Sequence, residues 1–148
     1  MSMNKKKVIS IVNLITSMSL LTFVTIITHT EFILPPFLAT AATKYPDPDW
    51  RRIRFFNIVI SYLISSVIAV LFIYFNLTGL VMAILASFVS YITEVIINIE
   101  HPPSILACFL GVLEKVKFIY ILHPVLSGVI IEESVNYILT KYVEPKLP

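Results

Sequence analysis

The sequence predicts an all-α protein: a polytopic transmembrane bundle of four long helices and two half-helices broken by Pro-Pro pairs. Three observations lead to this fold class. Only 14% of the 148 residues are charged, against ~25% in soluble domains, and the mean hydropathy is +0.90. Residues 8–30 and 55–93 contain no Asp, Glu, Lys or Arg, and Pro-Pro pairs stand at 35–36 and 102–103.

The same composition excludes several classes of protein. Disordered chains combine low hydrophobicity with high charge, and a disulfide-stapled fold needs paired cysteines, whereas Cys108 is single. A net charge of +2 without a basic face does not fit a nucleic-acid-binding protein. We therefore expect one transmembrane domain over residues 1–148, in contact with the lipid bilayer and without a nucleic-acid partner.

The charge-free runs locate the long helices. Crossing a bilayer takes ~20 apolar residues at ~1.5 Å per residue, so spans are expected at 8–30, 55–75 and 79–98, with a last span at about 118–140. The turn between the second and third spans is expected at Asn76-Leu77-Thr78-Gly79. Lipid requires internally bonded backbone, and no stretch alternates like a strand, so the spans are helical. Residues 8–30 also exceed a signal-peptide h-region of ~7–15 residues, which favours a retained span.

Two short apolar segments, 32–43 and 101–113, each contain a Pro-Pro pair. Proline suits the first helical turn and breaks what precedes it, so each segment is expected to be an extended entry and a half-helix that starts near the second proline. The order of long helix, half-helix and long helix occurs twice. Residues 8–75 therefore match 76–142 in layout, which predicts a pseudo-repeat of two halves.

The basic residues favour one of two topologies. If the half-helices only dip into the membrane, there are four crossings and the two sides carry five and six Lys or Arg residues. If they cross, there are six passages, and nine basic residues lie on the side of the N-terminus against two opposite. The positive-inside rule favours six passages with a cytoplasmic N-terminus. The two halves then start on opposite sides of the membrane, which is an inverted repeat. We expect the protein in the plasma membrane. Four crossings with two re-entrant segments is the alternative.

The half-helix N-termini are the first candidate site. In transporters such ends point free N–H groups and a positive dipole at anionic substrates. We expect two such ends near Pro36 and Pro103, with hydroxyl donors beside them and a proton-carrying histidine at the entry of the second. The candidate substrate-binding residues are Pro36, Thr40, Thr43, His101, Pro102, Pro103 and Ser104. The alternative is that the proline pairs only shape surface loops.

Embedded acidic residues form the second candidate site. Glu132 and Glu133 lie inside the last span, and Asn136 follows Glu132 by one turn. A charge in lipid is costly, so these residues are candidates for proton or ion coupling, unless they lie in the headgroup zone. Glu94 and Glu100 are expected at the interface. The aromatic residues expected as interface anchors are Tyr45, Trp50 and Tyr62.

No cofactor, metal site or enzymatic activity is expected. The histidines lack an i, i+4 ligand spacing, and the sequence contains no phosphate-binding Gly loop and no Ser-His-Asp set. Cys108 is interpreted as a packing residue rather than a nucleophile.

The tripeptide His101-Pro102-Pro103 resembles the signature of the HPP family of small integral membrane proteins. The stretch 36–41, Pro-Phe-Leu-Ala-Thr-Ala, is similar to the family's Pro-Phe-Gly-Ala-Thr-Ala. Residues 57–65 and the Pro124-Val125-Leu126 segment with Gly128 and Asn136 look like later family segments, in the same order over roughly 10–140. Leu38, the stretch 104–107 and Tyr62 depart from the pattern, because the family has Gly, Ala-Gly-Ala-Thr and His there.

The resemblance implies a multi-span helical protein and, from some plant members, nitrite transport into plastids. The leading hypothesis is therefore a small-anion transporter or channel, with nitrite as substrate and the site between the half-helix N-termini. The second hypothesis is a non-catalytic membrane subunit or scaffold of a larger complex. A chain of 148 residues encloses little volume, so a homo-oligomer or other membrane subunits are expected in either case.

Overall fold

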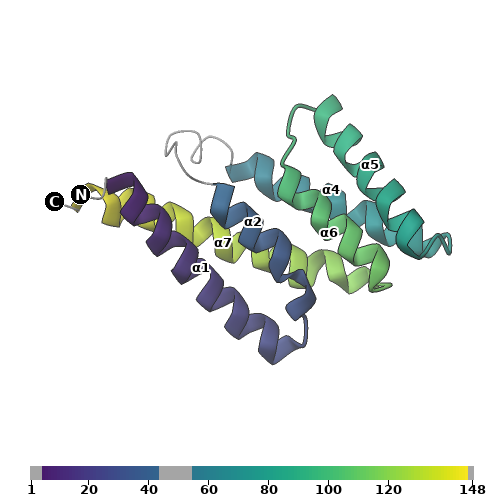
Figure 1. The fold of residues 1–148 in the computed structure, drawn as a ribbon, viewed down its shortest axis with the longest axis horizontal. Helices are drawn as coiled ribbons and strands as arrows, with labels where there is room; N and C mark the ends of the chain where they lie inside the picture. The colour runs from purple at the N-terminus through teal and green to yellow at the C-terminus, as the bar shows by residue number, and fades with distance from the viewer. Residues whose placement is uncertain (1–4, 44–54, 147–148) are drawn as a thin grey trace.

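The computed structural model describes residues 5–43 and 55–146, with the side chains of Lys6 and Thr43 outside the description. Every regular element in these ranges is helical, which confirms the all-α prediction (Figure 1). The α-helices are α1 (Lys5–Thr28), α2 (Leu34–Thr43), α4 (Phe55–Tyr74), α5 (Leu80–Ile96), α6 (Pro102–Leu113) and α7 (Ser127–Ile138). The 3-10 and π-helical turns are η1 (Glu31–Ile33), η2 (Phe118–Ile121), η3 (Leu122–Leu126), η4 (Leu139–Val143) and η5 (Glu144–Lys146).

The predicted spans coincide with helices, but not all of them are long. Within the described ranges, three segments are long and apolar enough to cross a membrane: Lys7–Thr28, Phe55–Tyr74 and Phe118–Lys146. The third segment consists of η2, η3, α7, η4 and η5 in succession. It is kinked at His123, whose backbone is extended. Helix α5 has 17 residues, fewer than the ~20 of a full crossing. The expected count of four long helices is therefore not met.

Four helices end in the same motif. A residue one or two positions past the end of α1, α4, α5 and α6 adopts a positive φ; these residues are His29, Asn76, Asn98 and Lys115. The N–H that follows returns to the carbonyl five residues back, in the bonds Thr30 to Thr25, Leu77 to Phe72, Ile99 to Glu94 and Val116 to Gly111. This is the Schellman termination, which satisfies the last carbonyls of a helix. It also confirms the turn predicted at 76–79, where Gly79 has φ +95°.

The two half-helices contain their prolines in the first turn. Pro102 is the first residue of α6, after the N-cap His101. Helix α2 starts at Leu34, one residue before its Pro-Pro pair, because the 3-10 turn η1 leads into it without a break. Both therefore begin slightly earlier than the second proline. Their lengths, 10 and 12 residues, are about half of a membrane crossing.

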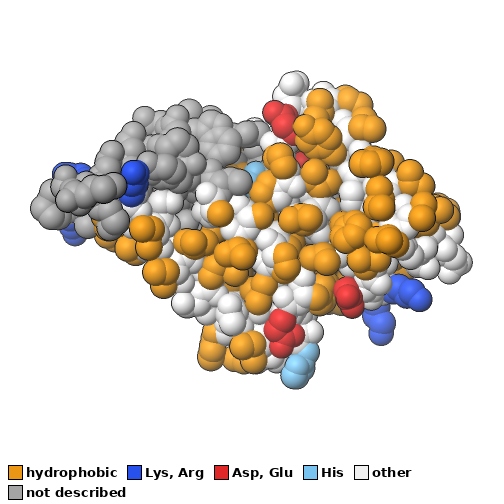
Figure 2. Space-filling model, viewed as in Figure 1, with side chains coloured by type: hydrophobic (Ala, Val, Ile, Leu, Met, Phe, Trp, Pro, Cys, Tyr) orange, Lys and Arg blue, Asp and Glu red, His pale blue; other side chains and the backbone are white. Residues whose placement is uncertain are grey.

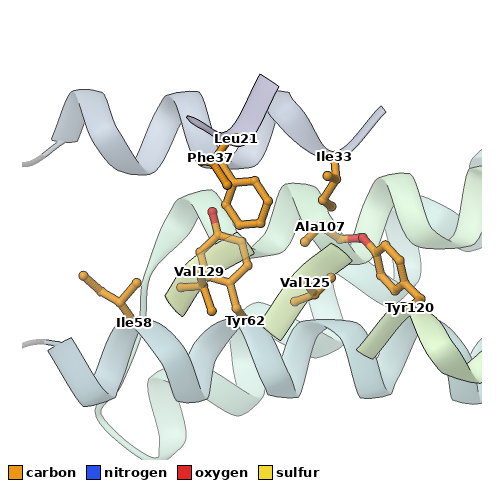
Figure 3. Close-up of a cluster of buried hydrophobic side chains, with 9 residues drawn as sticks. All are labelled: Leu21, Ile33, Phe37, Ile58, Tyr62, Ala107, Tyr120, Val125 and Val129. Atoms are coloured by element: carbon orange, nitrogen blue, oxygen red, sulfur yellow. The ribbon is translucent and has the colours of Figure 1, made fainter. Parts of the chain in front are cut away.

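The core lies where the half-helices meet the long helices. Helix α6 packs against α4 and α5, and α2 lies between α1 and α6, while α7 runs along α1. One apolar cluster joins all of these except α5, and Figure 3 shows its aromatic centre. Its buried members are Leu21, Ile33, Phe37, Ile58, Tyr62, Ala107, Tyr120, Val125 and Val129. A second cluster of mostly small residues, which includes buried Cys108, packs α5 and α6 on α4.

The described surface is apolar and much of the interior is polar. Figure 2 shows hydrophobic side chains over most of the described part of one face, with lysine side chains at its two ends. The described residues with 0% exposure include Asn13, three glutamates and seven serines and threonines. The glutamates are Glu94, Glu132 and Glu133, and the serines and threonines are Ser17, Thr40, Ser61, Ser65, Ser66, Ser90 and Ser104. This distribution is the one expected of a protein surrounded by lipid, which solvates Ile and Phe but no hydroxyl or carboxyl group.

Candidate functional site

A buried carboxyl group lies at the start of α6. Glu94, near the end of α5, has no exposed surface, and its two oxygens accept hydrogen bonds from three helices and a loop. Oε1 is 2.9 Å from Ser65 Oγ, 2.8 Å from Ser104 Oγ and 3.3 Å from Ser90 Oγ. Oε2 accepts the His101 backbone N–H at 3.0 Å. We call Glu94 and these four donors the Glu94 centre. Glu94, which we expected at the membrane interface, is thus enclosed by protein on all sides.

The backbone explains why Glu94 occupies this place. Asn98 adopts a positive φ and turns the chain after α5, so that residues 97–101 return over the end of that helix. Ser61 Oγ donates to the Ile99 carbonyl and fixes this connection to α4. His101 then begins α6 directly above the Glu94 side chain, whose carboxyl group complements the positive end of the α6 dipole.

The half-helices do not offer free N–H groups to an anion. At α6 the His101 N–H is bonded to Glu94, Pro102 and Pro103 have none, and the Ser104 N–H donates to the His101 carbonyl at 2.9 Å. At α2 the Leu34 N–H donates to the Glu31 carbonyl, and the two residues after Leu34 are prolines. The prediction of free N–H ends is therefore wrong, because proline itself removes the donors.

His101 connects the Glu94 centre to α2 and α4. Its Nε2 is 2.8 Å from Thr40 Oγ1, which is 2.7 Å from the Tyr62 hydroxyl. All three side chains are buried. Two pairs of residues give the relative direction of the half-helices. Thr40, near the end of α2, meets His101 at the start of α6. Ile33, just before α2, shares a cluster with Ala107 in the middle of α6. The two half-helices thus lie side by side in opposite directions (Figure 1), and only the α6 N-terminus enters the network.

Tyr62 is held by aromatic packing. Its ring stacks on Phe37 with centroids 5.3 Å apart, and the His101 ring lies 5.9 Å away. Figure 3 shows the Tyr62 hydroxyl directed toward the Phe37 side of the cluster. Phe37 in turn rests on Gly128 of α7, where a Cβ would come within 2.3 Å of its ring. Tyr62 is therefore a core residue, and its predicted role as an interface anchor is wrong; Tyr45 and Trp50 lie outside the described residues.

The two glutamates of α7 are inside the bundle. Glu132 and Glu133 have no exposed surface and Asn136 is 4% exposed, so all three residues are enclosed by the protein. Helix α7, which carries them, contacts α1, α2 and α4.

The structure brings some predicted site residues together and separates others. Thr40, His101 and Ser104 share the network around Glu94. Pro36 and Pro103 are buried in the first turns of their helices, whereas Pro102 is exposed. Thr43 is the last residue of α2, and its side chain lies outside the description. In the described part of the chain, no three His, Cys, Asp or Glu residues gather as metal ligands.

Sequence reasoning missed Glu94, Tyr62, Ser65 and Ser90 as members of the site. One signal was available: Ser90 and Glu94 are four residues apart on α5, so they share a helical face. They share this face of α5 with the small residues Ala83 and Ala86. Small side chains allow close contact, so this face of the helix is expected to pack against other helices. What that face contacts could not be read from spacing.

Comparison with known protein families matches residues 2–147 to one of them, described as HPP, transmembrane region. Neither the curated proteins nor the solved structures contain a match to this chain.

Proposed function

Because the chain belongs to the HPP transmembrane family, we propose that this integral membrane protein is a transporter that carries a small monovalent anion, nitrite first, together with a proton. The observation that carries the proposal is the buried series Tyr62–Thr40–His101 beside Glu94. Hydroxyl, imidazole and carboxyl groups inside an apolar shell are costly, and in membrane proteins such groups mark substrate and proton paths.

The anion would bind on the Thr40 side of this series. The α6 N-terminus already holds a carboxyl group, so it supplies no further donor. Thr40 and Tyr62 carry hydroxyls, and His101 carries a ring nitrogen that donates or accepts according to its tautomer. Nitrite is small, accepts hydrogen bonds through its oxygens and carries one charge, so it matches this set.

A proton would accompany the anion for an electrostatic reason. Glu94 is buried beside this series, and like charges repel strongly where water is excluded. An anion therefore enters most easily when a nearby carboxyl or imidazole group takes up a proton. Glu132 and Glu133, with Asn136, are the coupling residues that we propose, beside His101.

The proposed topology follows from the lengths of the half-helices and from the distribution of the Lys and Arg residues along the chain. Helices of 10 and 12 residues cover about half of a ~30 Å core, and an extended entry completes each passage. We propose six passages in the plasma membrane with a cytoplasmic N-terminus, two inverted repeats, and a homo-oligomer without enzymatic activity.

Flux into liposomes tests the function. The full chain is reconstituted into vesicles that contain a nitrite sensor and a pH-sensitive dye, and nitrite is added outside at pH 5 and at pH 7. We expect nitrite entry above empty vesicles, faster at pH 5, with acidification of the interior. Thr40→Val removes the central hydroxyl and should reduce entry, whereas Thr28→Val, at an exposed hydroxyl at the end of α1, should not.

The absence of flux at both pH values would exclude the transporter and favour the alternative, a non-catalytic membrane subunit or scaffold. One observation supports that alternative: the Glu94 centre is bonded on both oxygens, as a purely structural polar centre would be. The scaffold predicts stable co-purification with other membrane chains.

A further inference from the structure

One end of the bundle carries a cluster of exposed lysines. Helix α1 contacts η4 and η5, and the two ends of the chain lie together in Figure 1. The described lysine side chains of these elements are Lys5 and Lys7 on α1, Lys141 on η4 and Lys146 on η5, and all of them are exposed. We call these residues the terminal lysine cluster.

The positive charge of this cluster is not balanced by the described residues around it. In the described part of the chain, no ion pair joins any of its lysines, and η4 and η5 contribute one acidic residue, Glu144. The opposite end of the bundle, where η1 and η2 lie together, carries Lys115 and Lys117 but also Glu31 and Glu114. The two ends therefore differ in charge, and the terminal lysine cluster is the positive one.

Two tyrosines hold Lys141 in place. Its Nζ atom donates to the Tyr137 hydroxyl at 2.7 Å and lies 5.1 Å from the centroid of the same ring. The Tyr142 ring lies on the other side, with its centroid 5.3 Å from Nζ. Both tyrosines are exposed, and tyrosine is enriched where the hydrocarbon core of a bilayer meets the headgroups. This end of the last span thus has the composition of a headgroup-level anchor.

The length of α1 places its lysines at the same level. The apolar span Lys7–Thr28 has 22 residues, which rise ~33 Å and match a hydrocarbon core of ~30 Å. Lys5 and Lys7 stand in the first turns of α1, so their ammonium groups reach the headgroup region. Ile11 and Ile15, one and two turns further along, are exposed and face the acyl chains.

We propose that the terminal lysine cluster, with Tyr137 and Tyr142, binds the headgroup of an anionic phospholipid. Ammonium and phenol groups donate hydrogen bonds to phosphate oxygens, and an anionic headgroup balances positive charge that the described residues leave uncompensated. A zwitterionic headgroup brings a cation of its own and leaves that charge in place. Because the cluster belongs to both the first and the last span, the bound lipid joins the two ends of the chain.

Binding of fluorescent phosphatidylglycerol to the purified full chain in detergent tests the site, with labelled phosphatidylcholine measured in parallel. We expect phosphatidylglycerol to bind at least about tenfold more tightly, because each basic residue near an anionic surface is worth a factor of about five. It should also raise Tm more than phosphatidylcholine does, since a ligand that binds only the folded state stabilises it. Lys5→Gln/Lys141→Gln removes one charge from each span and should weaken phosphatidylglycerol binding about tenfold.

Lys115→Gln/Lys117→Gln is the matched control. It lowers the net charge of the chain by the same amount at the opposite end of the bundle, and it should leave the affinity for phosphatidylglycerol unchanged. Lys141→Gln alone serves if the double variant of the cluster does not fold, and it should weaken binding about fivefold.

Three results would overturn the site. The first is equal affinity of the wild-type chain for the two lipids, and the second is equal phosphatidylglycerol affinity of the cluster variant and the control variant. The third is inorganic phosphate that raises Tm as much as phosphatidylglycerol does, because the ligand would then be a free anion and not a lipid. Binding is measured without flux, so it succeeds or fails independently of nitrite transport.

Discussion

The two buried polar regions of this protein differ in how completely they are bonded. At the Glu94 centre, four donors from α4, α5, α6 and the connection before α6 surround one carboxyl group. On the buried face of α1, Asn13 and Ser17 are equally buried and have no hydrogen-bond partner. The first region is complete without a ligand. The second contains buried polar atoms without a hydrogen-bond partner among the described residues.

The difference has a topological cause. The chain returns after Asn98 and brings the start of α6 back over the end of α5, so donors from several directions converge on Glu94. Helices α1 and α7 instead pack along each other in antiparallel directions (Figure 1). No returning connection brings donors or acceptors to Asn13 and Ser17 in the described part of the chain, so these two side chains are left without hydrogen bonds.

The largest effect is expected for Glu94→Leu. This variant leaves the Ser65, Ser90 and Ser104 hydroxyls and the His101 N–H without their acceptor. At about 0.6 kcal/mol for each bond in a membrane protein, and more for donors left unpaired, the loss is roughly 3 kcal/mol. Thermal unfolding in detergent measures it. Glu114→Gln, at an exposed carboxyl group just after α6, is the control and should leave Tm unchanged; an equal Tm for Glu94→Leu would show that the centre is not structural.

The next effect is expected for Gly128→Ala. Its Cβ would lie 2.3 Å from the Phe37 ring, and that ring cannot withdraw because it is buried against Tyr62. Overpacking of this kind costs about 2 kcal/mol. The double variant with Phe37→Leu provides space and should recover most of the lost Tm. If Gly128→Ala alone unfolds like the wild type, the contact between α7 and the Tyr62 network is not tight.

A smaller effect on stability is expected for Thr40→Val. The side chain keeps its shape, but the Tyr62 hydroxyl and His101 Nε2 lose the group that joins them, at about 1 kcal/mol. The same variant should reduce nitrite entry into liposomes more than this small loss of stability explains. Normal flux with a normal Tm would remove Thr40 from the proposed site.

The smallest effect, with the opposite sign, is expected for Asn13→Leu. Leu has nearly the same size and removes two unpaired polar atoms, so Tm should stay equal or rise by the equivalent of ~1 kcal/mol or less. The comparison of the two regions is sharpest here. If Asn13→Leu lowers Tm as Glu94→Leu does, the Asn13 amide is bonded in the native protein and the two regions are alike.

Much of the secondary structure could be predicted because each signal is local. The charge-free runs gave the positions of α1, α4 and α5, and the turn formers at 76–79 gave the break between α4 and α5. The proline pairs marked both half-helices to within two residues. The length of α5 was overestimated, because the apolar run continues through Ile97, whereas the helix ends at Ile96 and the chain turns away with a positive φ at Asn98.

The candidate site could be predicted only in part. Thr40, His101 and Ser104 were chosen for their nearness to the proline pairs, and the structure joins them. The expected reason, free N–H groups at the helix ends, was wrong, since the prolines remove two donors and Glu94 takes another. Glu94 was assigned to the interface because it stands near the end of an apolar run. The sequence does not show that the connection after α5 folds back and buries this residue.

The sequence by itself determined that this is a helical membrane protein, where its helices lie and where they break, because hydropathy, proline and turn formers act over a few residues. Only the tertiary structure decided which polar groups meet. Periodicity gives the direction of a side chain on its own helix, but the partner of His101 lies 61 residues away, on Thr40, and the donors to Glu94 come from three helices. Hydrogen bonds between helices depend on their packing, and the packing is set by the whole chain.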